Sequence, residues 1–110
     1  MKCLNLITLA FLAFSIEVMA QKDIFPTPVS VKEQSGSFTI NSKTAIHYDN
    51  ASEKSAKGFH QLLSLNTGFD IAIKQSESKD SQVIIFTSKN IDPSLGKEGY
   101  TLEISAKCIV

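Results

Sequence analysis

An apolar run near the N-terminus limits what the rest of this chain can fold into. Leu4–Ile16 is interrupted only by short polar residues, Lys2 precedes it, and Val18-Met19-Ala20 follows it closely. A charged start, an apolar stretch and small residues at a cleavage site are typical of a secretory signal peptide. A membrane-spanning helix would need about 20 apolar residues, and Cys3 precedes the run instead of following it, as a lipoprotein cysteine would. We therefore predict a signal peptide over residues 1–20 and a secreted or periplasmic protein.

The remaining sequence, residues 21–110, suffices for one small domain. The full chain has a formal net charge of zero and contains no arginine. Nucleic-acid binding relies on clustered basic residues, so we expect no nucleic-acid partner, and no membrane contact after cleavage of the signal. Cys108 is the only cysteine after the leader. An intrachain disulfide therefore lacks a second cysteine, and a cysteine-based zinc site lacks a second cysteine ligand. We expect no metal and no cofactor.

Three short segments at the start of the mature chain alternate apolar and polar residues. They are Val29–Val31, Phe38–Ile40 and Ala45–Tyr48. Turn-forming residues at 34–37 and 41–43 separate them. Alternation is typical of half-buried strands, and short turns join antiparallel neighbours. We predict that these segments form an antiparallel meander.

The hydrophobic period then changes from two residues to three or four. The apolar residues that share one helical face are Ala56, Phe59, Leu62 and Leu63. This spacing predicts a helix over about Ser52–Asn66. Asn50 or Ser52 is expected to cap its start, with Glu53 completing a capping box. Gly68 lies just past the end, where a left-handed residue closes a helix.

The second half of the chain contains further strand patterns. The segments are Phe69–Ile73, Val83–Phe86, Tyr100–Ile104 and a last strand that begins at Cys108, after a turn at Ala106-Lys107. Val83–Phe86 is continuously apolar, as in a strand covered on both faces. The whole pattern predicts an α+β fold: a mixed β-sheet of about six short strands with one helix packed on a face. The chain ends on three apolar residues, so we expect Val110 to be a truncation inside a strand; a natural end at a sheet edge is the alternative.

The polar residues that could carry chemistry are scattered along the sequence. His47 lies in a predicted strand, and His60 lies on the polar side of the predicted helix, where we expect solvent around it. Asp70 and Glu103 occupy outward positions of alternating strands, whereas acid–base catalysis needs paired groups in a cleft. Asn50-Ala51-Ser52 matches the N-glycosylation sequon, which has no consequence in a bacterial host, and the same residues are predicted to begin the helix. We predict no catalytic, cofactor-binding or metal-binding residue.

Three short motifs occur in order along the mature chain. Ile24-Phe25-Pro26-Thr27-Pro28 precedes a strand, the helix ends in Leu65-Asn66-Thr67-Gly68-Phe69, and Glu98-Gly99-Tyr100 leads into another strand. With this order and spacing, the chain from Ile24 to Val110 resembles the N-terminal, non-catalytic domain of family 20 glycoside hydrolases, the β-N-acetylhexosaminidases.

The resemblance implies a zincin-like accessory domain whose second helix is missing from this chain. In the family, a catalytic (β/α)8 barrel follows, and its adjacent Asp-Glu pair works with the substrate's own acetamido group. This sequence has no adjacent Asp-Glu pair, and a barrel needs about 200–250 residues. The resemblance therefore implies an accessory domain of a β-N-acetylhexosaminidase that is inactive as this fragment. Its expected partner is the barrel, which would in turn bind glycans.

The Gly99-Tyr100 step is expected to have a structural role. Gly99 would give the backbone freedom to enter the strand, and Tyr100 would pack its ring and bond its hydroxyl. Two alternatives stay open: a stand-alone carbohydrate-binding or interaction module, and the equivalent domain of another glycosidase family. Sugar-binding modules usually present exposed aromatic rings, and this chain has no tryptophan.

Overall fold

A single helix and four short strands make up the regular structure of the part of the chain that is described. The computed structural model describes residues 27–110, so the predicted signal peptide lies outside the described residues. Residues 34–110 form one compact unit, and residues 27–33 belong to a separate one. The elements are β1 (Ala45–Tyr48), the 3-10 turn η1 (Asn50–Ser52), α1 (Glu53–Thr67), β2 (Ala72–Gln75), β3 (Val83–Phe86), the 3-10 turn η2 (Pro93–Leu95) and β4 (Cys108–Ile109).

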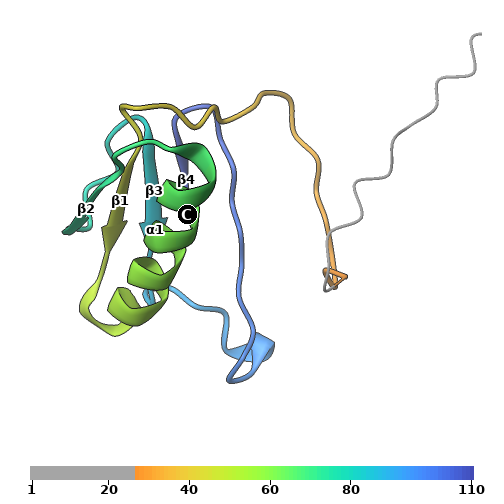
Figure 1. The fold of residues 1–110 in the computed structure, drawn as a ribbon. Coiled ribbons are helices and arrows are strands. Elements are labelled where there is room, and N and C mark those ends of the chain that lie inside the picture. The colour runs from red at the N-terminus through yellow and green to blue at the C-terminus, as the bar shows by residue number, and fades with distance from the viewer. Residues whose placement is uncertain (1–26) are drawn as a thin grey trace, which may run out of the picture. The chain divides into compact units, whose positions relative to one another are not determined.

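The strands form a parallel sheet in the order β2-β1-β3-β4, and α1 lies across one face of it (Figure 1). The register aligns a row of isoleucines across all four strands: Ile73, Ile46, Ile84 and Ile109. Side chains alternate between the two faces along a strand, so this row points to one face, where it joins the core under α1. A slip of one residue would send the row to the other face, so burial specifies the register. The predicted α+β fold with one helix on a face is confirmed.

The core between α1 and the sheet is small. Its fully enclosed members are Ile46, Ala56, Ile71 and Ile84. Ala56 presents only a methyl group, so the helix backbone can approach β1 closely. One helical turn further on, Phe59 packs its ring against Phe86 of β3, with 5.4 Å between the ring centroids. Aromatic pairs at this distance are favourable beyond the area that they bury.

The helix lies within one residue of its predicted range at each end. Gly68 follows it with a φ of 71°, and its N–H donates to the Ser64 carbonyl at 2.9 Å, as predicted for the closing residue. Leu63 packs against the core, but Leu62, predicted on the same face, is 62% exposed. The reason is that α1 packs over β1, β2 and β3, and among the described residues none covers the flank on which Leu62 lies.

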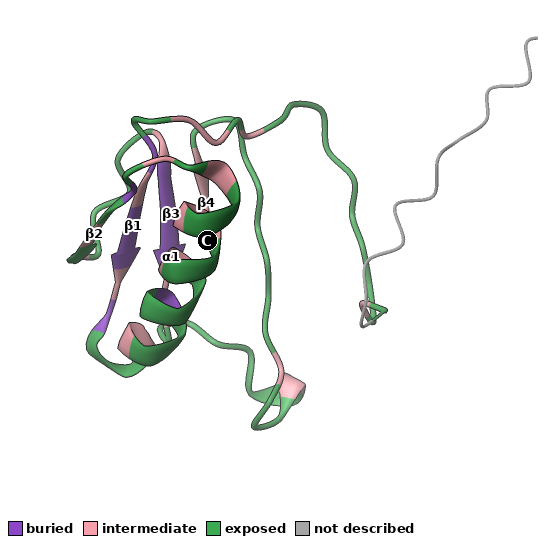
Figure 2. Cartoon of the chain, in the orientation of Figure 1, coloured by how far each residue is buried: buried purple, intermediate pink, exposed green. Residues whose placement is uncertain are grey.

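The second face of the sheet is also covered near its centre. Because β2 and β3 flank β1 on opposite sides, the connection at residues 76–82 must cross over β1. His47 marks this crossing: it is 2% exposed, and its Nδ1 donates to the Ser78 carbonyl at 2.9 Å. Val83, Ile84 and Ile85 are all less than a tenth exposed, and β1 and β3 form the buried centre of Figure 2. The prediction that β3 is covered on both faces is confirmed.

The predicted antiparallel meander is wrong. Val29–Val31 and Phe38–Ile40 form no strand, and both neighbours of β1 run parallel to it. The physical reason is that β2 and the wholly apolar β3 occupy both edges of β1, which leaves no edge for an earlier segment. Val29 and Val31 stay 102% and 64% exposed.

The antiparallel pairing of this domain lies instead at its C-terminal end. Glu103 and Val110 exchange two backbone hydrogen bonds, each of 2.8–2.9 Å, around the predicted turn at Ala106-Lys107. Ile104 forms an isolated antiparallel bridge with Ile109 of β4, but Tyr100–Ile104 does not reach the length predicted for it as a strand. The described sheet therefore has four strands instead of about six. Within residues 27–110, no helix has the length and apolar character needed to cross a membrane.

Candidate functional site

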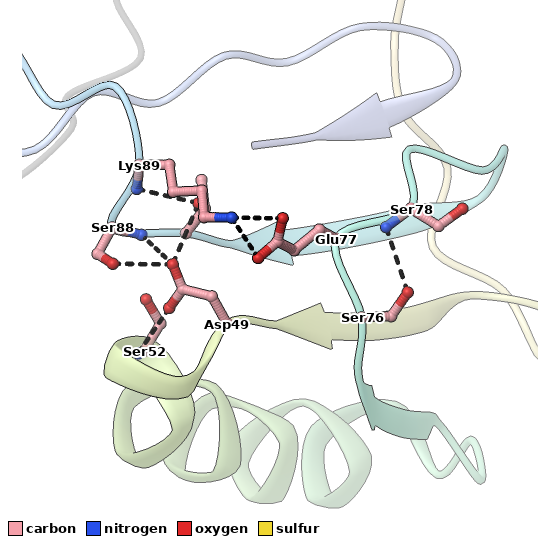
Figure 3. A network of polar contacts seen from close by, with 8 residues as sticks. Asp49, Ser52, Ser76, Glu77, Ser78, Ser88 and Lys89 are labelled. Atoms are coloured by element: carbon pink, nitrogen blue, oxygen red, sulfur yellow. Dashed lines mark hydrogen bonds and ion pairs between the residues drawn. The ribbon is translucent and has the colours of Figure 1, made fainter.

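Polar side chains gather at the carboxyl edge of the sheet, where β1 and β3 end. Asp49 follows β1 directly, and Thr87 and Ser88 follow β3. Parallel pairing brings these two strand ends together, and ligands of open α/β sheets bind at such an edge. This cluster, shown in Figure 3, is therefore the first place to look for chemistry.

The Asp49 carboxylate is enclosed by donors from its own chain. Oδ1 accepts from the Ser52 N–H at 2.9 Å, and Oδ2 accepts from the Ser88 N–H at 2.6 Å and the Ser88 hydroxyl at 2.8 Å. The Thr87 hydroxyl adds a longer bond of 3.2 Å to Oδ2. The side chain is only 7% exposed. These donors, the Ser88 N–H foremost, hold the pKa of Asp49 well below its ordinary value of 3.8, against the opposing effect of burial.

The hydrogen bonds of Asp49 join η1 to the chain after β3, and they make its carboxylate poorly suited to proton transfer. A general base must keep its carboxylate available to a substrate proton, and its pKa should lie near the working pH. Asp49 has the opposite properties, since its bonds tie η1 to the chain that leaves β3 and its charged form is strongly favoured.

Beside it, Lys89 Nζ lies 2.6 Å from both carboxylate oxygens of Glu77, with both side chains about 60% exposed. An exposed pair of this kind contributes little to stability.

Asp49 also corrects the predicted helix start. The residue that caps the first turn is Asp49, and neither Asn50 nor Ser52 supplies a side-chain cap to α1. Glu53 forms no capping box, because its carboxylate pairs with Lys57 one turn along the helix at 2.5 Å. The sequence signal that was missed is an aspartate directly before the first turn, which is as good a capping residue as asparagine or serine.

The two histidines have structural roles. His47 is enclosed between the sheet and the loop that crosses over β1, where the Ser78 carbonyl accepts a hydrogen bond from its Nδ1. His60 was predicted to be solvated, and this is wrong: it is half-buried, and its Nε2 donates to the Ile71 carbonyl at 2.7 Å. A carbonyl oxygen can only accept, so the ring nitrogen carries the proton. The bond links the middle of α1 to the residue before β2.

The remaining residues considered from the sequence lie apart from one another. Asp70 and Glu103 are exposed, in the segments before β2 and before the C-terminal turn. Cys108 is half-buried at the sheet edge, and its sulfur lies 3.7 Å from the Ser105 hydroxyl. Over residues 27–110, no three His, Cys, Asp or Glu side chains come close enough together to hold a metal ion.

The roles of Gly99 and Tyr100 both differ from those expected from the sequence. Gly99 has no left-handed φ, so backbone freedom is not what it provides. A methyl group on its Cα would instead overlap the backbone carbonyl and the Cβ of Leu95. Glycine is therefore required by the close approach of η2. Tyr100 does not pack into the core, since it is 66% exposed.

Several large apolar side chains remain on the surface. They are 54–81% exposed in two groups, with Leu62 and Leu65 on α1 and Tyr100, Leu102 and Ile104 before the C-terminal turn. Ile104 lies opposite Ile109, which belongs to the core on the α1 face. Paired residues in a bridge share a face, so the second group extends the α1 face past β4. Exposed apolar surface of this kind is typical of a protein–protein contact.

Comparison with known proteins identifies the type of domain. No curated protein matched the chain. The family described as glycosyl hydrolase family 20, domain 2, matches residues 21–110. This domain is an accessory domain of the family's hexosaminidases, and in full-length enzymes it is associated with a catalytic domain. From residue 21 to residue 110, the chain belongs to glycosyl hydrolase family 20, as its domain 2.

Proposed function

We propose that this chain is an exported accessory domain of a β-N-acetylhexosaminidase and has no hydrolytic activity by itself. The family match over residues 21–110 is the observation that carries the proposal. It covers everything after the predicted leader, and it is a match to the accessory domain. The sequence contains no adjacent Asp-Glu pair of the kind that the family's barrel uses.

The polar cluster at the carboxyl edge supports the same proposal. Side chains of an active site must keep donor or acceptor atoms free to bond the substrate. The Asp49 oxygens are instead bonded to Ser52, Thr87 and Ser88. This cluster stabilises the domain and leaves catalysis to another part of the enzyme.

The exposed apolar groups supply a surface with which the domain could contact the rest of the enzyme. Leu65 is 81% exposed and Tyr100 is 66% exposed. The cost of leaving such side chains in water is recovered when a partner covers them, at about 25 cal/mol for each Å² of apolar area. An accessory domain that packs against a catalytic barrel gains stability in this way.

An activity assay tests the proposal directly. The purified protein is incubated with a chromogenic N-acetylglucosaminide, beside a complete family 20 enzyme as the positive control. We expect no turnover above the buffer blank. Hydrolysis that co-purifies with the chain through two unrelated columns would overturn the proposal.

Export is tested separately, by the mass of the protein recovered outside the cytoplasm. Cleavage after Ala20 predicts a mature chain that begins at Gln21. Recovery of an intact Met1 would contradict the signal-peptide part of the proposal. The family match predicts that the full-length enzyme also has a catalytic domain, and sequencing of the reading frame after the Val110 codon tests this.

One observation favours a second candidate, a carbohydrate-binding module. Tyr100 is an exposed aromatic residue, and such rings stack on sugars. Titration with chitin oligosaccharides by calorimetry, using the protein and Tyr100→Ala, distinguishes the two. Heat that is lost with the substitution would favour the module. A flat titration for both proteins would favour the accessory domain.

A further inference from the structure

The correction of the helix start changes what can be said of Asn50-Ala51-Ser52. The sequence predicts that Asn50 or Ser52 caps the start of the helix, which would engage a side chain of this sequon. In the structure Asp49 caps the first turn, and Ser52 makes no side-chain cap bond. Asn50 is exposed. Within the part of the chain that the structure describes, no hydrogen bond engages the side-chain amide of Asn50, whereas the Ser52 side chain helps to lower the pKa of Asp49.

The contrast with Asn41 shows that this is not true of every asparagine in the domain. The Asn41 amide oxygen accepts from the Lys43 N–H at 2.8 Å, and its nitrogen donates to the Thr39 carbonyl and to Gln82. A glycan on that nitrogen would break contacts that the fold uses. A glycan on Asn50 would break none of the contacts within residues 27–110. Asn50-Ala51-Ser52 is also the only Asn-X-Ser/Thr sequence in the chain.

We propose that Asn50 is an N-glycan acceptor when the chain is exported through a compartment that contains an oligosaccharyl transferase. The inference rests on the proposed export, because the modification takes place on the secretory route. The donor is a lipid-linked oligosaccharide diphosphate. The Asn50 amide nitrogen bonds to the anomeric carbon of the first sugar, the bond from that carbon to the diphosphate oxygen breaks, and the lipid diphosphate leaves with the electron pair. The displaced amide proton passes to a base of the transferase.

The position of Asn50 keeps a glycan away from the exposed leucines of α1. A helix rises about 1.5 Å per residue, so Leu62 and Leu65 lie about 20 Å further along, near the other end of α1. A glycan at the start of the helix and a partner protein at its end are therefore compatible. The modification therefore attaches near the opposite end of α1 from these two leucines.

The test uses a eukaryotic secretory host and two forms of the protein. One carries its own residues 1–20, and the other carries residues 21–110 behind a proven secretory leader. We expect both to show a band that is shifted in mobility by one glycan. Peptide N-glycosidase should collapse this band and leave an aspartate mass at position 50. Asn50→Gln and Ser52→Ala should each abolish the shift, whereas Ser52→Thr should retain it.

The two forms separate failure of export from failure of the site. If only the form with the proven leader is secreted and modified, the site is correct and the export proposal is wrong. If that form is secreted without a glycan while a control glycoprotein from the same cells is modified, the inference is overturned. A shift that persists in Ser52→Ala would also overturn it, because the acceptor would then lie elsewhere. Circular dichroism of each variant confirms that it is folded.

Discussion

Replacement of Asp49 by asparagine should be among the most damaging conservative changes in this domain. The substitution keeps the size of the side chain, but it turns one carboxylate oxygen into an NH2 donor. If the remaining oxygen keeps the Ser52 N–H, the new donor faces the Ser88 N–H, which now has no acceptor. The Ser88 hydroxyl can rotate to accept, whereas the N–H cannot. Loss of a charge-assisted bond and the orphaned N–H together cost about 2–4 kcal/mol.

Urea unfolding followed by circular dichroism measures this loss. A domain of this size has a stability near the lower end of the usual range of about 5–15 kcal/mol and a urea dependence of about 1 kcal/mol per M. The midpoint for Asp49→Asn should therefore fall by about 2 M or more. Asp92→Asn is the matched control: Asp92 caps η2 through the Ser94 N–H at 2.9 Å, but it is exposed. Its midpoint should move much less.

The pH dependence gives a second measurement of the same interaction. The Asp49 pKa is lowered in the folded protein, chiefly by the Ser88 N–H, relative to an ordinary value of 3.8. The unfolded chain therefore binds the proton more readily, and the stability that Asp49 contributes is fully present above about pH 4 and declines as the pH falls below it. The protein should lose stability on acidification through this range, and Asp49→Asn should lose less. Equal urea midpoints at neutral pH, or equal acid slopes, would refute the stabilising role of the Asp49 carboxylate.

Three further changes test the core, the glycine and the surface. Ile46→Ala empties a fully buried position of the central strand and should cost about 2–5 kcal/mol in urea unfolding; a loss below about 1 kcal/mol would contradict the small-core description. Gly99→Ala brings a methyl group into the backbone of Leu95 and should lower the melting temperature, which an unchanged thermal scan would contradict. The protein should self-associate through its exposed apolar surface, so replacing Leu62 and Leu65, which are 62% and 81% exposed, by lysine should shift sedimentation toward the monomer without lowering stability. Sedimentation of the unsubstituted protein as a monomer at high concentration would contradict this.

The positions of several elements follow from the sequence because local periodicity determines them. Ala45–Tyr48 and Val83–Phe86 are strands with the bounds predicted from their alternation and their apolar run. The helix ends where Gly68 supplies a left-handed residue. In each case, a few neighbouring residues contain the whole signal.

The pairing of the strands could not be predicted in the same way. Alternation reports which residues share a face, but it does not report the neighbour or its direction. The turn residues before Ala45–Tyr48 favoured an antiparallel partner, whereas its two parallel partners, β2 and β3, lie beyond the helix. The capping role of Asp49 had a local signal that was missed, but its bond to the chain after β3 had none. Its strongest bond joins it to Ser88, 39 residues away, and no local pattern reports such a contact.

Two residues that were expected to be buried, Leu62 and Tyr100, are exposed instead. Leu62 was predicted on the apolar face of the helix, and Tyr100 was expected to pack its ring, yet they are 62% and 66% exposed. Their sequence pattern is that of buried residues, but the domain leaves them exposed. Such a mismatch is expected where function requires a partner. Leu62 lies on α1 itself, and Ile104, four residues after Tyr100, extends the α1 face beyond β4 through its pairing with Ile109. We infer that the sequence encodes a larger core than residues 27–110 complete, and that the missing part of this core is supplied by whatever packs on this face in the assembled enzyme.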